Sequence, residues 1–170
     1  MKHLIVTLIL FAFGGTMLAE TLSWGSLSNT GIEITIGKET KNQYKMQIRM
    51  KSYKSVKIEK DPVVLFKLED GNVLTLNGTL ESQSENTETS HIVSGNALIP
   101  YHKNTTHSEA TFPLTEEQFK ALLPGITKFR IKAFPSNYDK KWGEVKYGWK
   151  FRAMYRSANS SGSDSIQDGF

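Results

Sequence analysis

The sequence predicts an all-β protein: an antiparallel β-sandwich or, as the alternative, a small closed β-barrel, with one short helix at about residues 115–123. Two observations support this prediction. Apolar and polar residues alternate along several short segments, and turn-forming residues separate these segments. The length of 170 residues fits one domain, which we expect at residues 20–157. The absence of cysteine excludes disulfide scaffolds and thiolate zinc sites.

Residues 1–19 have the organisation of a secretory signal peptide. Lys2 and His3 precede an apolar run at residues 4–13, and small residues follow it. The run is too short to span a bilayer of about 30 Å, which favours a cleaved signal peptide over a membrane anchor. We therefore expect cleavage after Ala19 and export to the periplasm or the extracellular space.

Alternation of apolar and polar residues predicts the first strands. Segments 32–36 and 44–50 each place isoleucine, tyrosine or methionine at every second position, which is the period of a half-buried strand. Residues 61–80 are expected to form two further strands joined at Asp70 and Gly71. An Asp-Gly pair readily takes the two positive φ angles of a type I′ turn, so this segment predicts a hairpin.

The middle of the chain is expected to be less regular. Residues 81–90 contain no apolar side chain, so we expect a mobile loop there. A strand over residues 91–100 and a second polar loop over residues 101–108 follow in this interpretation.

One helix signal comes next, in the sequence FPLTEEQFKALLPG. Thr115 can cap the first turn and Gln118 completes a capping box, while Pro124 and Gly125 end the helix. A helix of about two turns is not stable alone, so its apolar side must pack against a sheet.

The C-terminal part is predicted to supply a central strand. Residues 126–134 and 145–157 are two more alternating segments, and in the second of them Trp149 would face the core while Lys150 faces solvent. The serine-rich residues 158–170 are expected to be a disordered tail.

The run FPLTEEQFKALLPGITKFRI, together with the upstream hairpin sequence LFKLEDGNVLTL, resembles small exported β-rich proteins of Bacteroidetes-type bacteria that have no assigned activity. The resemblance covers about half of the mature chain. It implies export and a β-rich fold, and it assigns no catalytic or binding residue to this sequence.

The net charge of +4 hides a strong segregation of charge. Residues 38–60 carry eight basic and two acidic side chains, residues 61–125 carry three and nine, and residues 126–157 carry nine and two. Basic residues recur at alternate positions of the two predicted C-terminal strands. If these strands are neighbours, their outward faces form one basic surface, although a solvated strand face explains the same pattern.

A basic surface attracts anionic partners: an anionic glycan, a lipid headgroup or an acidic protein surface. The sequence has no dedicated nucleic-acid motif. Tyr138 and Trp142 fall in the predicted loop between the two strands, where their rings can stack on a sugar, unless Trp142 folds back to cap the core. The candidate ligand-binding residues are Lys128, Arg130, Lys132, Tyr138, Trp142, Lys146, Lys150, Arg152 and Arg156.

Motifs for catalysis are absent from the sequence. It contains no G-x-S-x-G, no H-E-x-x-H, no phosphate-binding loop and no dinucleotide-binding fingerprint, so we expect a protein that is not an enzyme and has no cofactor. His102, His107 and Glu109 fall near one another in the sequence, but their spacing matches no metal-ligand motif, and we expect no metal site.

The function that these observations predict is that of an exported, non-enzymatic binding or interaction module for an anionic ligand. A first alternative is a structural component of a cell-envelope or surface assembly. A second is a lipocalin-like carrier of a small apolar ligand, whose cavity would be lined by Tyr147, Trp149, Phe151 and Tyr155.

Overall fold

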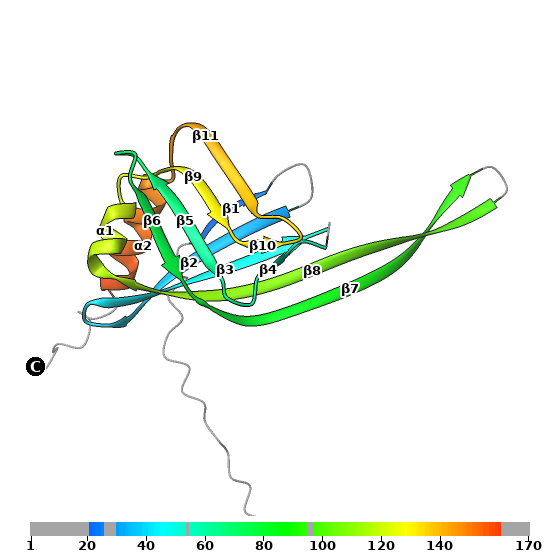
Figure 1. The fold of residues 1–170 in the computed structure, drawn as a ribbon, viewed down its shortest axis with the longest axis horizontal. Helices are drawn as coiled ribbons and strands as arrows, with labels where there is room; N and C mark the ends of the chain where they lie inside the picture. Colours follow the sequence, from blue (N-terminus) through cyan, green and yellow to red (C-terminus); the bar gives the residue numbers. More distant parts are fainter. Residues whose placement is uncertain (1–20, 26–29, 54, 95–96, 161–170) are drawn as a thin grey trace, which may run out of the picture.

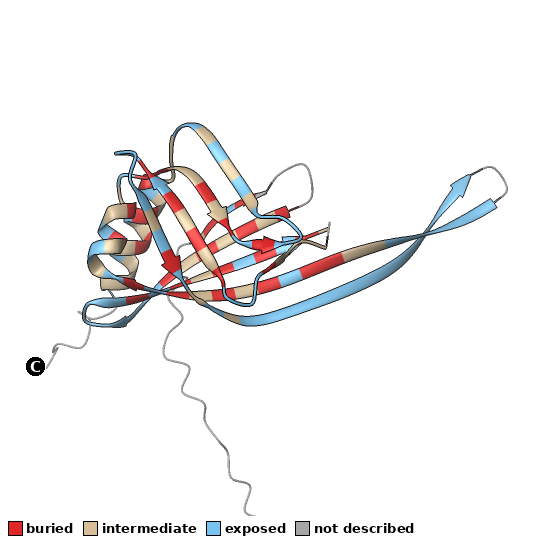
Figure 2. Cartoon of the chain, viewed as in Figure 1, coloured by how far each residue is buried: buried red, intermediate tan, exposed pale blue. Residues whose placement is uncertain are grey.

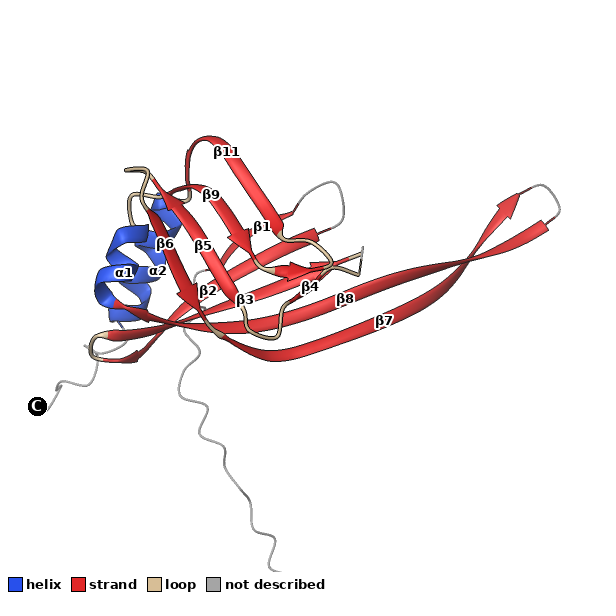
Figure 3. Cartoon of the chain, viewed as in Figure 1, coloured by secondary structure: helices blue, strands red, loops and turns tan. Residues whose placement is uncertain are grey.

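The structure is a computed structural model, and it describes residues 21–25, 30–53, 55–94 and 97–160. The predicted signal peptide at residues 1–19 lies outside this part of the chain. The described residues form a five-stranded and a four-stranded antiparallel sheet that face each other, with a two-stranded sheet beside them and two helices at one end (Figures 1 and 3). The fold is an all-β antiparallel sandwich, as the alternation predicts.

The five-stranded sheet has the order β1-β2-β3-β8-β7, and the four-stranded sheet has the order β11-β9-β5-β6. The first consists of β1 (Thr21–Gly25), β2 (Thr30–Thr40), β3 (Gln43–Ser52), β8 (Ala97–Thr115) and β7 (Thr79–Ser94). The second consists of β11 (Tyr138–Lys146), β9 (Ile126–Ile131), β5 (Val63–Leu68) and β6 (Val73–Asn77). The small sheet pairs β4 (Lys57–Ile58) with β10 (Ala133–Phe134).

One apolar core fills the space between the two large sheets. Alternate residues of β2, β3 and β5 are buried in it, because successive side chains of a strand point to opposite faces (Figure 2). The ring of Trp24 on β1 meets that of Phe129 on β9 with 5.0 Å between the ring centroids. Burial of each such side chain contributes about 1.5–3 kcal/mol, so these contacts hold the sheets together.

Neither large sheet closes on itself within the described residues. The strands β1 and β7 are the edges of the five-stranded sheet, and β11 and β6 are the edges of the four-stranded sheet. The alternative of a closed barrel is therefore wrong.

The hairpin predicted at residues 61–80 is confirmed as β5 and β6, but its turn differs from the prediction. Gly71 has φ +88°, and no neighbouring residue of the turn has a positive φ. The backbone N–H of Gly71 donates to the carbonyl of Leu68 at 3.2 Å. A type I′ turn requires two consecutive positive φ angles, so the predicted turn type is wrong.

A long hairpin of β7 and β8 replaces the two polar loops predicted at residues 81–90 and 101–108. Ladder pairing runs from Thr79 opposite Thr111 to Ser94 opposite Ala97, so the strand predicted over residues 91–100 is the end of this hairpin and reverses direction within it. The pairing partner β3 leaves β8 at Thr106. Residues 86–94 and 97–105, which we call the arm, thus extend beyond the body as a two-stranded ribbon (Figure 1).

The helix expected near residue 115 is confirmed as α1 (Glu116–Leu122). Thr115 is its N-cap, and its side chain accepts a hydrogen bond from the N–H of Gln118 while the Gln118 side chain accepts from the N–H of Thr115. Both bonds of the capping box satisfy N–H groups that the first turn leaves free. Phe119 and Leu122 are buried, which fixes the helix against the sheets.

The strand predicted at residues 145–157 is wrong: the chain turns at Tyr147 and continues as the helix α2 (Gly148–Ser160). Tyr147 has φ +69°, which ends the strand β11. Phe151 and Met154 are fully buried, whereas Trp149 is 60% exposed. The predicted core position of Trp149 is therefore also wrong.

The end of α2 corrects the predicted start of the tail. Residues 158–160 belong to the helix, and the side-chain oxygen of Asn159 accepts hydrogen bonds from Tyr44 Oη at 2.9 Å and from Lys38 Nζ at 2.7 Å. These bonds tie the helix to β2 and β3. Residues 161–170 lie outside the described part of the chain.

Candidate functional site

The structure distributes the predicted basic residues over a sheet and a helix. Lys128 and Arg130 lie on β9, Lys132 follows that strand, and Lys146 is the last residue of β11. The remaining three, Lys150, Arg152 and Arg156, are on α2. The prediction that all seven form one face on two neighbouring strands is wrong, because it required residues 145–157 to be a strand.

A smaller basic surface exists on the outer face of the four-stranded sheet. In the antiparallel register, Lys128 on β9 lies opposite Lys67 on β5 and opposite Lys141 on β11. All three point away from the core, since their neighbours along the strands, Phe66, Phe129 and Trp142, are buried in it or packed against it. We call Lys67, Lys128 and Lys141 the lysine row; directly opposed side chains of this kind have Cβ atoms about 5 Å apart.

Asp139, the acid that lies opposite Arg130 beside this row, is already paired. Arg130 donates to Asp139 twice, from Nε to Oδ1 at 2.7 Å and from Nη2 to Oδ2 at 3.1 Å, and Lys128 Nζ lies 3.4 Å from Oδ1. The hydrogen bond from Arg130 holds the pKa of Asp139 below its ordinary value, with the charges of Arg130 and Lys128 acting in the same direction. No ion pair of Lys67 or Lys141 is found among the described residues, so the row keeps a positive charge.

Tyr138 and Trp142 lie on the strand β11, and the loop predicted for them is wrong. Trp142 packs edge-on against Trp24 at 5.5 Å and against Tyr147 at 5.3 Å between ring centroids. Tyr138 packs against Phe129, and burial raises the pKa of its hydroxyl. Both rings are half-buried against the core, which agrees with the interpretation that Trp142 caps one end of it.

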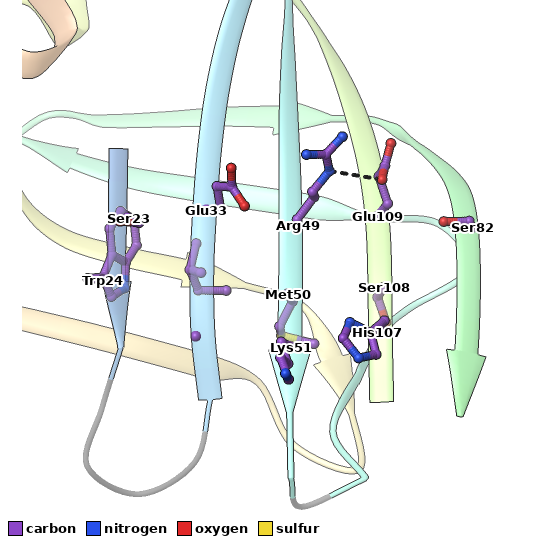
Figure 4. Close-up of a pocket in the computed structure, with 12 residues that line it drawn as sticks. Ser23, Trp24, Glu33, Arg49, Met50, Lys51, Ser82, His107, Ser108 and Glu109 are labelled. Carbon is purple, nitrogen blue, oxygen red and sulfur yellow. Dashed lines mark hydrogen bonds and ion pairs between the residues drawn. The ribbon is translucent and has the colours of Figure 1, made fainter. Parts of the chain in front are cut away.

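A groove of about 620 Å³ lies on the outer face of the five-stranded sheet (Figure 4). Arg49 Nε donates to Glu109 Oε2 at 3.1 Å, and Gln47 donates to the other oxygen of Glu109 at 2.5 Å. The groove combines acids and bases, and its polar lining includes Ser23, Glu33, Arg49, Lys51, His107 and Glu109. Its charges nearly balance, so it suits a polyanion less well than the lysine row does.

The groove was missed by the sequence interpretation, although a signal for it exists. Its charged side chains occupy alternate outward positions of β2, β3 and β8, where Glu33, Arg49 and Glu109 share one row of the sheet. Recognising that row requires the strand order, because β8 follows β3 in space but comes after more than forty residues of other structure in the chain.

The two histidines near Glu109 do not form a common site. His102 and His107 are both on β8, five positions apart, and therefore point to opposite faces of the strand. Within the described residues, no group of three or more His, Asp or Glu side chains is arranged to hold a metal ion.

The residues proposed to line a carrier cavity are also separated. Phe151 lies on the buried side of α2. Trp149, two positions before it, is 60% exposed, and Lys150 Nζ lies 4.7 Å from the centroid of its ring. They do not line one common interior space, and the carrier alternative loses the arrangement on which it depended.

Comparisons with protein-family models and with curated proteins find no relative of this chain. Neither described helix combines the length and the apolar character needed to cross a bilayer. Arguments about function therefore start from the surfaces described above.

Proposed function

We propose that this protein is an exported, non-enzymatic binding module for an anionic ligand, and that the lysine row is its contact surface. The observation that carries the proposal is the direct opposition of Lys67, Lys128 and Lys141 on three adjacent strands. Like charges in directly opposed positions destabilise a sheet, so a fold gains from a ligand that neutralises them.

The size of the repulsion indicates a modest gain. Two unit charges at about 4 Å repel by about 1 kcal/mol in water, and salt screens this energy further. Asp139 cannot relieve the repulsion fully, because Arg130 occupies both of its oxygens. A bound anion gains the attraction of the row and removes the mutual repulsion of the lysines.

The geometry of the row favours a linear ligand with repeated negative charges. Adjacent strands are about 4.8 Å apart, so the three lysines spread their charges over about 10 Å across the sheet. An acidic polysaccharide offers charges along a chain in this way. A single lipid phosphate would contact only part of the row.

Salt-dependent retention on heparin tests this proposal. The double variant Lys128→Glu/Lys141→Glu should lose retention that the wild-type protein shows at low salt, and wild-type retention should fall steeply towards physiological salt. The variant Lys150→Glu/Arg152→Glu has the same change of net charge on α2 and should keep most of its retention. Retention that ignores salt, or that is equal in the two variants, contradicts a role for the lysine row.

A structural role in an envelope or surface assembly is the second candidate function. Its support is the strand β7, which spans sixteen residues at the edge of the five-stranded sheet and has no strand on its outer side within the described chain. Such an edge can pair with another subunit. A mature protein that stays monomeric by light scattering over a wide concentration range would count against assembly.

Export is part of the proposal, and it rests on the sequence of residues 1–19. The mature chain should begin within about three residues of Glu20. N-terminal sequencing of the processed protein checks this expectation, and an intact Met1 in the processed protein would contradict it.

A further inference from the structure

Exposed apolar side chains are concentrated at the end of the arm. Of the eight large apolar residues that are exposed in the described chain, five lie there. The described end of the arm is exposed on both strands (Figure 2). We call these five the arm tip: Ile92 (55% exposed), Val93 (70%), Leu98 (68%), Ile99 (51%) and Tyr101 (42%). Exposed clusters of this kind in a soluble fold mark interaction surfaces.

Both faces of the ribbon are apolar at the tip. Ile92 lies opposite Ile99, and Val93 lies opposite Leu98. Successive residues of a strand point to opposite faces, so one pair covers each side of the ribbon. A partner with a flat or one-sided groove would cover one pair and leave the other in water. The tip therefore fits a medium that is apolar on all sides.

Charged side chains are kept away from this end. The sequence from Thr89 to His102 contains no Asp, Glu, Lys or Arg. The first charged pair behind the tip is Glu88 opposite Lys103. The apolar pairs thus lie within a charge-free segment, between the outermost described pair, Ser94 opposite Ala97, and Tyr101.

The arm carries the tip clear of the body. Nine residues of β8, from residue 97 to residue 105, lie beyond its last pairing with β3, and a rise of about 3.4 Å per residue gives a reach of about 30 Å. At its base the arm is held by Lys103, whose Nζ lies 4.3 Å from the ring centroid of Tyr53. The tip can therefore touch an extended surface while the sandwich stays in water.

A second copy of the chain is a poor occupant. The other exposed large apolar residues are Val73 on β6, Phe134 on β10 and Trp149 on α2, which lie on three separate elements. A tip-to-tip contact would use five apolar side chains a side, whereas a stable interface uses about 20–30 residues a side. Pairing of two β7 strands is also unfavourable, since β7 carries Glu81, Glu85 and Glu88 and neither Lys nor Arg.

We propose that the arm tip inserts into the interfacial region of a lipid bilayer. The end of the ribbon from the pair Ser94–Ala97 to the pair Ile92–Ile99 spans about 7 Å at about 3.4 Å per residue, within the about 5–10 Å at which apolar side chains of surface-bound segments are buried. This shallow depth leaves the unpaired backbone edges of the ribbon among headgroups and water, where they can be hydrated. Tyrosine is enriched at this boundary, which suits the position of Tyr101.

Vesicles of neutral phosphatidylcholine test the insertion without involving the lysine row. The mature full chain should co-float with such vesicles, and the double variant Val93→Ser/Leu98→Ser should bind at least tenfold more weakly. Val73→Ser removes an apolar residue of β6 that is 56% exposed, and it serves as the control with unchanged binding. Failure of heparin binding would leave this result unaffected, so the two proposals can fail separately.

Tryptophan fluorescence measures whether the arm tip enters the bilayer. The variant Val93→Trp should show quenching by brominated phosphatidylcholine, whereas Val73→Trp should show no more quenching than the wild-type protein. Circular dichroism and the melting temperature should match the wild type in all variants, because the tip lies outside the core. Absence of wild-type vesicle binding, or binding equal in Val93→Ser/Leu98→Ser, overturns the proposal; self-association lost in that variant without vesicle binding would instead assign the tip to a second copy.

Discussion

Arg130 and Asp139 form a two-point ion pair across the strands β9 and β11, at 2.7 and 3.1 Å. The sequence predicts Asp139 in a loop outside the basic strands, but the register places it directly opposite Arg130. Asp139 therefore neutralises Arg130, and the positive charge of this outer face comes from the lysine row.

Substitution Asp139→Asn is expected to have a small, pH-dependent effect on stability. Arg130 lowers the pKa of Asp139 in the folded state, so the stabilisation is present above about pH 4, the unfolded pKa, and is lost as the pH falls through the lower folded pKa. Because both side chains are about 40% exposed, the loss at pH 7 should not exceed about 1 kcal/mol. Urea unfolding at pH 7 and at pH 2 measures it, with Asp61→Asn as a control; a difference that grows at low pH would contradict the ion pair.

The same substitution should strengthen the binding of an anion. Asp139→Asn removes the acid next to Lys128 and frees Arg130. The variant should therefore elute from heparin at a higher salt concentration than the wild-type protein. Asp61→Asn makes the same change of net charge away from the row and should shift retention less. Equal shifts in both variants would assign binding to net charge alone.

Phe151→Ala and Trp149→Ala should differ strongly in their cost to stability, whereas an alternating strand, which puts both side chains on the core face, predicts similar losses. Phe151 is fully buried, and its truncation should cost about 3–5 kcal/mol of unfolding free energy. Trp149 is 60% exposed, so its truncation should cost less than about 1 kcal/mol. Chemical denaturation of both variants decides, and a large loss for Trp149→Ala would contradict the helix α2.

The C-terminal helix was missed because two periods overlap in its sequence. Phe151 and Tyr155 fit both a strand with period two and a helix with a spacing of four residues. Met154 and Ala158 complete the helical pattern, and Met154 is buried while Ala158 packs against the core. These two positions distinguish the helix from the strand, since they lie at i+3 and i+7 from Phe151, on the same face of a helix.

The arm was missed for a different physical reason. A ribbon that projects from the body exposes both of its faces, so no apolar period marks its strands. By contrast, the capped helix α1 and the sandwich strands were predicted correctly, because capping and burial leave local patterns in the sequence. Of the lysine row, Lys128 is a candidate from the sequence alone, whereas Lys67 and Lys141 needed the register of three strands.

Substitution Gly148→Ala should weaken the packing of the two helices. A Cβ at Gly148 would meet the backbone of α1's end, with Pro124 C at 2.7 Å and Leu123 O at 2.9 Å. Backbone atoms cannot swing aside as a side chain can, so we expect a loss of about 1–3 kcal/mol or more. Gly37→Ala, which meets nothing within 4 Å, is the control and should be close to neutral in thermal unfolding.

Hydrogen exchange should divide β8 into two parts. Residues 106–115 pair with β3, and residues 106–111 also pair with β7 on the other side, whereas residues 97–105 pair with β7 alone. An isolated two-stranded ribbon is marginally stable in water, so amides of the arm should exchange much faster than those of the inner part. Addition of phosphatidylcholine vesicles should slow exchange at residues 97–102 and leave residues 106–115 unchanged. Strong protection of the arm in water at low protein concentration would show that the ribbon is stable by itself, and no change with vesicles would speak against contact with lipid.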